Sequence, residues 1–141
     1  MQFTSSNATA GGERHISLEM RNLGVGPAIV RSFAVAYRGR FVATLGELLR
    51  ACCPDVKQHV YSSTVAQTVI MAHDAIAFID MPPGYAQGAT FEQLNAMRSN
   101  IRVVACYCSV LDDCWVFDSA SGRAPAAVRH CPAQQQPQYT T

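Results

Sequence analysis

A cysteine-rich segment between Val103 and Phe117 constrains the fold more than any other part of this chain. An apolar stretch rich in strand-forming side chains is followed by Asp112-Asp113 and then by a second apolar stretch. This pattern predicts two antiparallel strands joined by a tight turn, because Asp is a favoured turn residue. Side chains alternate between the two faces of a strand, so Cys106 and Cys108 are expected on one face, about 7 Å apart at their Cα atoms.

Short strands and turns are expected along most of the remaining chain, with two short helices among them. Two capping boxes, Thr44 with Glu47 and Thr90 with Gln93, each predict the start of a helix, and Pro54 ends the first one. Apolar runs predict strands over residues 15–23, 28–37, 40–43, 64–71, 75–81, 101–111, 114–118 and 126–131. This order favours a mostly β protein, a sandwich of antiparallel sheets.

The chain has the length of a single domain, with 141 residues. We expect residues 1–13, which are small and polar, to form a flexible lead-in. Residues 14–132 are expected to form the β-sandwich domain. The glutamine-rich residues 133–141 offer little with which to build a core and are expected to be a disordered tail.

The charge and hydropathy patterns exclude two classes of function. The formal net charge is +1 and the arginines are scattered, so the basic stripe typical of nucleic-acid binding is missing. No run of about 18 apolar residues is present, and the sequence itself therefore predicts no membrane-spanning helix.

The cysteine count favours disulfide bonds and an oxidising compartment, because an even number of cysteines in a small domain is typical of exported proteins. The alternative is that several cysteines are buried, unbonded apolar side chains. One expected arrangement joins Cys114 to Cys131 and joins Cys52 or Cys53 to Cys106 or Cys108. Six cysteines allow 15 arrangements, so this remains one of several. A bond between the neighbours Cys52 and Cys53 is not expected.

A metal or redox module is the alternative interpretation of the cysteines. Cys106 and Cys108 on one face are suitably placed to supply two thiolate ligands, and thiolates favour soft ions such as Cu(I). A zinc site usually takes four ligands with characteristic spacings, and no second pair with such a spacing exists. We therefore assign no metal or other cofactor from the sequence.

No group of residues carries the pattern of a catalytic centre. His73-Asp74 and Asp112-Asp113 both fall at expected turns, where such side chains are usually solvated. The glycines of Gly24-Val25-Gly26 are followed at once by Pro27, without the helix that a phosphate-binding loop needs. Tyr107 and Trp115 are expected as core aromatics, with an exposed patch for a partner as the alternative. The sequence thus predicts a protein without enzymatic activity.

Two stretches together resemble a group of uncharacterised bacterial proteins whose soluble part follows one N-terminal transmembrane helix. These stretches are residues 22–28 with the Tyr37-Arg38-Gly39-Arg40 turn, and residues 106–115, and the resemblance covers residues 16–117. It implies an immunoglobulin-like sandwich on a membrane-anchored protein, on the periplasmic or exported side of the bacterial inner membrane. The membrane contact would lie in a segment absent from this chain. A structural or protein-interaction role is implied, with no activity attached.

Overall fold

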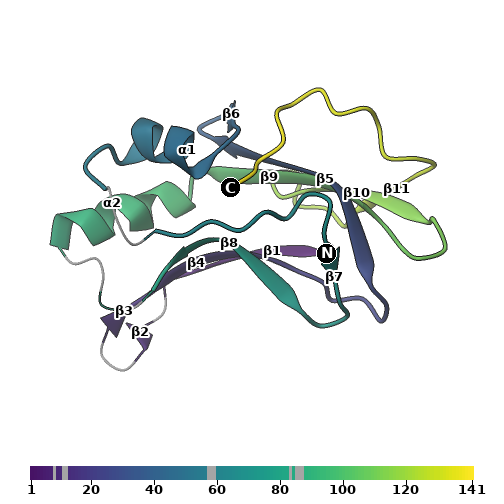
Figure 1. The fold of residues 1–141 in the computed structure, drawn as a ribbon, viewed down its shortest axis with the longest axis horizontal. Coiled ribbons are helices and arrows are strands. Elements are labelled where there is room, and N and C mark those ends of the chain that lie inside the picture. The colour runs from purple at the N-terminus through teal and green to yellow at the C-terminus, as the bar shows by residue number, and fades with distance from the viewer. Residues whose placement is uncertain (8, 11–12, 57–59, 83, 85–87) are drawn as a thin grey trace.

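The fold is described from a computed structural model that covers residues 1–141 except residues 8, 11–12, 57–59, 83 and 85–87. The described chain is mostly β, with antiparallel sheets and two helices, as the sequence predicts. Two sheets lie one above the other in Figure 1, and the two helices lie together at one end of them.

The smaller of these two sheets has the order β1-β4-β8. Its strands are β1 (Gln2–Ser6), β4 (Ile16–Arg21) and β8 (Ala75–Met81), and both neighbouring pairs are antiparallel. A short hairpin of β2 (Thr9–Ala10) and β3 (Glu13–Arg14) lies between β1 and β4 in the chain.

The larger sheet has the order β11-β10-β9-β5-β6, and β7 also pairs with the start of β5. Its long central strands are β5 and β9, which contact each other along most of their length. The strands are β5 (Ala28–Tyr37), β6 (Arg40–Val42), β7 (Val69–Ile70), β9 (Ile101–Cys108), β10 (Cys114–Asp118) and β11 (Ala126–Val128).

The first capping box forms as predicted and begins α1 (Leu45–Cys52). Thr44 Oγ1 accepts a hydrogen bond from Glu47 N, and Glu47 Oε2 accepts one from Ala43 N, one residue before the cap. The second helix, α2 (Gly88–Arg98), begins two residues before Thr90, so Thr90 lies inside the first turn and does not cap it. The prediction of a cap at Thr90 was therefore wrong, although the helix itself is confirmed.

The core lies between the two sheets, an arrangement consistent with a β-sandwich. Leu18 of β4, Phe33 of β5 and Phe78 of β8 are all fully buried in one hydrophobic cluster. The rings of Phe33 and Phe78 meet edge to face, with 5.0 Å between their centroids. Edge-to-face packing is a favourable geometry for aromatic rings, so this contact helps to hold the two sheets together.

Residues 64–71 form less strand than the sequence predicts. Gln67 has a positive φ of 63°, and Thr68 N donates to Val65 O. This turn breaks the extended backbone and leaves only β7 as strand. The predicted strand over 126–131 is likewise shorter, because the chain leaves the sheet after Val128 to bring Cys131 over β9.

The flexible lead-in predicted for residues 1–13 was wrong for residues 2–6, because β1 pairs with β4 along its whole length. Residues 8 and 11–12 of that range lie outside the described residues. Its polar side chains suit an edge strand, where one side faces solvent. Met1 and Phe3 are half-buried against the core, and this burial of apolar surface stabilises the docked strand.

The disordered tail predicted for residues 133–141 was also wrong. Tyr139 is fully buried, with its ring centroid 6.2 Å from that of Phe33 and 6.1 Å from that of Phe78. Tyr139 N donates to Phe33 O, and Phe33 N donates to Gln138 Oε1. The C-terminal segment, residues 133–141, thus hydrogen-bonds to the edge of β5 between the positions where β6 and β7 pair with that strand. Burial raises the pKa of Tyr139 to about 12, and its hydroxyl lies 3.1 Å from Ser62 Oγ.

We predict that Tyr139→Ala lowers the free energy of unfolding by about 3–5 kcal/mol, because it removes a buried aromatic ring and leaves a cavity. Chemical denaturation, followed by the fluorescence of Trp115, measures this loss. Gln135→Ala, at an exposed position of the same segment, is the matched control and should change stability by less than about 0.5 kcal/mol. Equal stability of the two variants would contradict the packing of the C-terminal segment.

Candidate functional site

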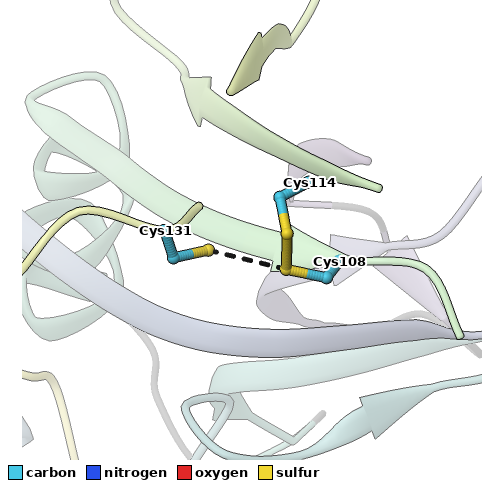
Figure 2. A group of neighbouring side chains, drawn as sticks. All are labelled: Cys108, Cys114 and Cys131. Atoms are coloured by element: carbon cyan, nitrogen blue, oxygen red, sulfur yellow. Dashed lines mark hydrogen bonds between the residues drawn. A yellow bond between two sulfur atoms is a disulfide. The ribbon is translucent and has the colours of Figure 1, made fainter. Parts of the chain in front are cut away.

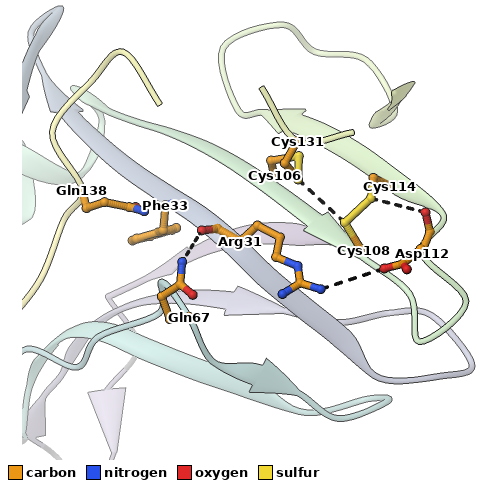
Figure 3. Close-up of a disulfide and its surroundings, with 9 residues drawn as sticks. All are labelled: Arg31, Phe33, Gln67, Cys106, Cys108, Asp112, Cys114, Cys131 and Gln138. Atoms are coloured by element: carbon orange, nitrogen blue, oxygen red, sulfur yellow. Dashed lines mark hydrogen bonds and ion pairs between the residues drawn. A yellow bond between two sulfur atoms is a disulfide. The ribbon is translucent and has the colours of Figure 1, made fainter. Parts of the chain in front are cut away.

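Four of the cysteines gather on the outer face of the larger sheet. Val103, Ala105 and Tyr107 of β9 belong to the core, so the alternating side chains of Cys106 and Cys108 point away from it. Figure 3 shows Cys131, just before the C-terminal segment, lying over these two residues. The alternation read from the sequence therefore places both β9 cysteines as expected.

The structure pairs Cys106 with Cys131 and Cys108 with Cys114 (Figure 3). The expected bond between Cys114 and Cys131 was wrong. Cys114 stands directly opposite Cys108 in the β9–β10 ladder, with their Cα atoms 4.0 Å apart. Cys131 instead lies with its Cα 5.7 Å from that of Cys106. The register of the hairpin, which the sequence pattern does not fix, thus decides the pairing.

The third disulfide joins the neighbours Cys52 and Cys53. The prediction that these two residues do not bond to each other was therefore wrong. Cys52 ends α1, and Cys53 leaves the helical conformation, with φ −147° and ψ 63°. This change of backbone direction allows the two neighbouring sulfur atoms to meet. A bond from this pair to Cys106 or Cys108 is excluded by position, because α1 lies at the other end of the larger sheet (Figure 1).

The two disulfides on the outer face nearly touch. Cys108 Sγ lies 3.8 Å from Cys131 Sγ, as Figure 2 shows, although each atom is bonded to a different partner. The Sγ atoms of Cys108, Cys114 and Cys131 all lie within 4.8 Å of one another. The structure thus places Cys114 and Cys131 beside Cys106 and Cys108, the two cysteines that the sequence indicates as candidate thiolate ligands. All four sulfur atoms are held in disulfides, so metal ligation would require their reduction.

A cavity of about 340 Å³ opens beside these sulfur atoms. Its lining carries more positive than negative charge, since it holds two arginines but one carboxylate. The lining residues are Arg31, Cys108, Asp112, Cys114, Arg129, His130 and Cys131, which we call the cysteine pocket. Arg31 Nη2 lies 3.9 Å from Asp112 Oδ1, and the Asp112 side chain is 87% exposed, so this ion pair is weak. A positive environment of this kind favours a thiolate over a thiol.

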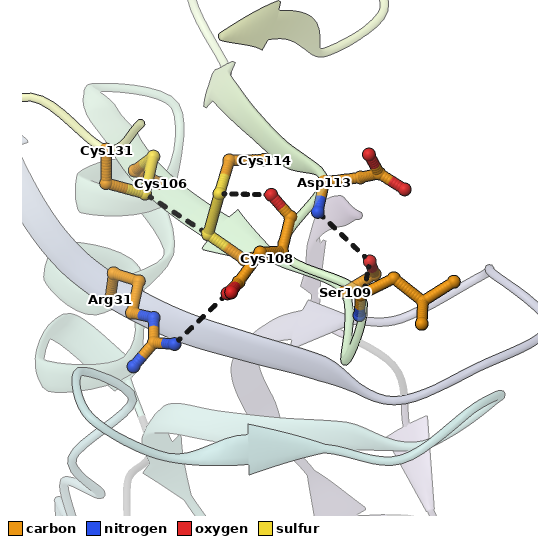
Figure 4. Close-up of polar contacts among 9 residues, drawn as sticks. Arg31, Cys106, Cys108, Ser109, Asp113, Cys114 and Cys131 are labelled. Carbon is orange, nitrogen blue, oxygen red and sulfur yellow. Dashed lines mark hydrogen bonds and ion pairs between the residues drawn. A yellow bond between two sulfur atoms is a disulfide. The ribbon is translucent and has the colours of Figure 1, made fainter. Parts of the chain in front are cut away.

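The loop between β9 and β10 is held in shape by Ser109. Its Oγ accepts hydrogen bonds from Leu111 N and Asp113 N, and its N donates to Asp113 O (Figure 4). Asp112 adopts a positive φ of 62°, which suits a turn. The loop therefore presents Val110 and Leu111 outward, where they are 66% and 81% exposed.

A second loop, between β4 and β5, lies at the same end of the molecule. Asn22, which is buried, donates from Nδ2 to Gly26 O and Ile70 O and accepts at Oδ1 from Gly24 N. A Cβ at Gly24 would lie 3.1 Å from that Oδ1, so glycine fits this close approach. The loop exposes Leu23 and Val25, and it borders a cavity of about 300 Å³ together with Tyr107, Cys108, Ser109 and Trp115.

Tyr107 and Trp115 stack on each other across the β9–β10 pair, with ring centroids 5.7 Å apart. Tyr107 is buried, and burial raises the pKa of its phenol. Trp115 is half-buried against the core. Both therefore act as core aromatics, the simpler of the two sequence interpretations.

The other candidate pairs are explained by local structure. His73 has a positive φ of 65° and its N donates to Asn22 O, while Asp74 Oδ1 accepts from Ala75 N, so both residues shape a turn. No sequence pattern predicts the contact between His15 Nε2 and Asp80 Oδ1, which are 2.7 Å apart although the two residues are far apart in the chain. It also missed Arg31, because only the paired strands bring this arginine beside the cysteines.

Comparisons with protein-family models, curated proteins and solved structures find no match for this chain. Within the described residues, neither helix has the length and apolar character needed to cross a membrane.

An ion pair fixes the β9–β10 pair on the same outer face as the cysteines. Arg102 Nε and Nη2 donate to Asp118 Oδ1 and Oδ2 at 3.0 and 2.6 Å. These hydrogen bonds are the main reason that the pKa of Asp118 is lowered, with a further contribution from Ala120 N. A lowered pKa in the folded state means that the carboxylate stabilises the fold above its unfolded pKa, about 3.9, and that this stabilisation is lost as the pH falls through the folded value.

We predict that Asp118→Asn lowers the free energy of unfolding by up to about 1 kcal/mol at pH 7, since the pair is partly exposed. The difference between the wild type and the variant should shrink as the pH is lowered from 6 to 2. Urea denaturation at a series of pH values measures it. A difference that stays constant or grows toward acid pH would contradict the role assigned to this carboxylate.

Proposed function

We propose that this chain is a non-enzymatic, immunoglobulin-like domain that binds another protein through an apolar surface formed by its loops. We further propose that it works on the exported side of a bacterial membrane, as part of a membrane-anchored protein. The resemblance of residues 16–117 is the basis for the anchor and for the bacterial source. The strand order, the disulfides and the exposed loops support the other parts of the proposal.

The strand order supports an immunoglobulin-like arrangement. In such domains strands A, B and E lie in one sheet, and G, F, C and C′ lie in the other. The order β1-β4-β8, and the order β10-β9-β5-β6 within the larger sheet, follow the same sequence when β1 is taken as strand A; β7 and β11 are additional strands. The chain departs from antibody domains in its disulfides. Two lie on the outer face of the larger sheet, the third joins neighbouring residues at the end of α1, and none joins the two sheets.

The pairing of all six cysteines supports an exported location, because disulfides persist in oxidising compartments and are rare in the cytosol. A domain of this size buries enough surface to fold without them. We therefore infer that the disulfides act mainly on the loops and the C-terminal segment and are not needed to build the core.

The observation that carries the proposed interaction is the position of the exposed apolar side chains. Among the described residues, all the large ones except Tyr61 lie in or next to the loops at one end of the sheets. These residues are Leu23, Val25, Val69, Met71, Val110 and Leu111, which we call the apolar loop end. A concentration of exposed apolar side chains is typical of a protein or membrane contact site.

The charges beside the apolar loop end favour a protein partner over a lipid surface. Asp74 and Asp113 are exposed in the same loops, and the exposed Asp112 is balanced in part by Arg31, 3.9 Å away. Anionic headgroups would repel these carboxylates, whereas a protein surface with an apolar centre and basic side chains at its rim would complement them. We therefore propose a partner protein with such a surface.

We predict that the double variant Val110→Ser/Leu111→Ser loses about 100-fold or more in affinity for this partner, because two side chains no longer bury apolar area on binding. Proteins from the source organism that bind the immobilised wild type but not the double variant identify the partner. Titration calorimetry with the purified partner then gives both dissociation constants.

Tyr61→Ser, which removes an exposed aromatic side chain away from the apolar loop end, is the control and should bind like the wild type. Three outcomes would overturn the proposal. They are equal binding by the double variant and the wild type, concentration-dependent dimerisation that the double variant abolishes, and binding to anionic lipid vesicles.

A further inference from the structure

We propose that Cys106, Cys108, Cys114 and Cys131 form a thiol–disulfide exchange site, in which Cys108 changes its partner from Cys114 to Cys131. The site would take a dithiol as its reactant, either a small molecule or the Cys pair of an oxidoreductase. This inference does not depend on the proposed binding function, since it rests on the sulfur atoms and their surroundings alone.

The first observation is the position of Cys108 between two possible partners. Its Sγ is bonded to that of Cys114 and lies 3.8 Å from that of Cys131 (Figure 2). Reacting atoms in a near-attack arrangement are about 3–3.5 Å apart, so only a small side-chain movement separates Cys108 from Cys131.

The second observation is the cysteine pocket, which borders three of the four cysteines and gives them a positive environment. Cys131 is the least buried of the four cysteines, and Cys108 and Cys114 also line the cavity. Arg31 and Arg129 lie in the same lining, against a single carboxylate. Because exchange proceeds through thiolates, these cationic groups favour both the attack and the departure of a sulfur.

The chemistry begins with reduction by the dithiol. One thiolate of the dithiol attacks Cys114 Sγ, a mixed disulfide forms, and Cys108 leaves as a thiolate. The second thiol of the reagent loses its proton and attacks the mixed disulfide, which releases Cys114 and leaves the reagent oxidised. Two electrons have then passed from the dithiol to the Cys108–Cys114 bond.

The exchange step follows and needs no further electrons. The Cys108 thiolate attacks Cys131 Sγ, so the Cys108–Cys131 bond forms and the Cys106–Cys131 bond breaks. Cys106 leaves as a thiolate and takes up a proton. The C-terminal segment stays tethered to β9, while the bond that closes the β9–β10 loop at residues 109–113 is lost. The exchange would therefore loosen Val110 and Leu111 without releasing the chain end.

The test uses the folded wild-type protein with one equivalent of dithiothreitol. Samples are quenched in acid, and free thiols are alkylated in acidic denaturant before digestion. Chymotrypsin cleaves after Tyr107, Leu111 and Trp115, and so places Cys106, Cys108, Cys114 and Cys131 on separate fragments. We expect the Cys108–Cys131 linkage to appear in at least a tenth of the molecules, with Cys106 and Cys114 alkylated.

Two variants examine the same step without a reductant. Cys114→Ser frees Cys108, and Cys106→Ser frees Cys131, and both should contain the Cys108–Cys131 linkage. Cys52→Ser is the matched control, because it frees a cysteine at the other end of the sheet and should leave the outer-face pairs unchanged. The proposal is overturned if this linkage is absent from the treated wild type and if each variant keeps only its remaining original bond.

Discussion

The two-sided character of β9 is the constraint on which the rest of the structure depends. Its inward side chains, Val103, Ala105 and Tyr107, join the core between the sheets, while Cys106 and Cys108 face outward. The inward half needs no covalent support, since the packing of Phe33, Phe78 and Tyr139 closes the core. On the outward half, the two disulfides hold the hairpin and the C-terminal segment in place.

This division connects the stability of the domain to its proposed binding role. The loop that exposes Val110 and Leu111 is closed at its base by the Cys108–Cys114 bond and shaped inside by Ser109. A preformed loop loses less conformational entropy when a partner binds, so the disulfide would raise affinity without contacting the partner. The exchange proposed for Cys108 would act on the same bond. Reduction or exchange of these disulfides would then loosen the part of the apolar loop end that lies in the β9–β10 loop.

The sequence predicted those features that depend on neighbouring residues, and it missed those that depend on the path of the chain in space. The alternation around Cys106 and Cys108, the cap at Thr44 and the turn at Arg38-Gly39, where both φ angles are positive, are local patterns. The pairing of Cys131 depends on how the C-terminal segment crosses the sheet, and no local pattern encodes that crossing. The strand at Gln2–Ser6 was missed for a related reason, because its polar composition suits an edge strand as well as a loop.

The central claim is that Cys106–Cys131 and Cys108–Cys114 are the bonds that secure the outer face of the larger sheet. Fragment mapping of the untreated wild-type protein, alkylated in acidic denaturant and digested with chymotrypsin, tests it most directly. We expect these two linkages together with Cys52–Cys53, and no alkylated cysteine. A dominant Cys114–Cys131 linkage, or six alkylated cysteines in protein from an oxidising compartment, would contradict it.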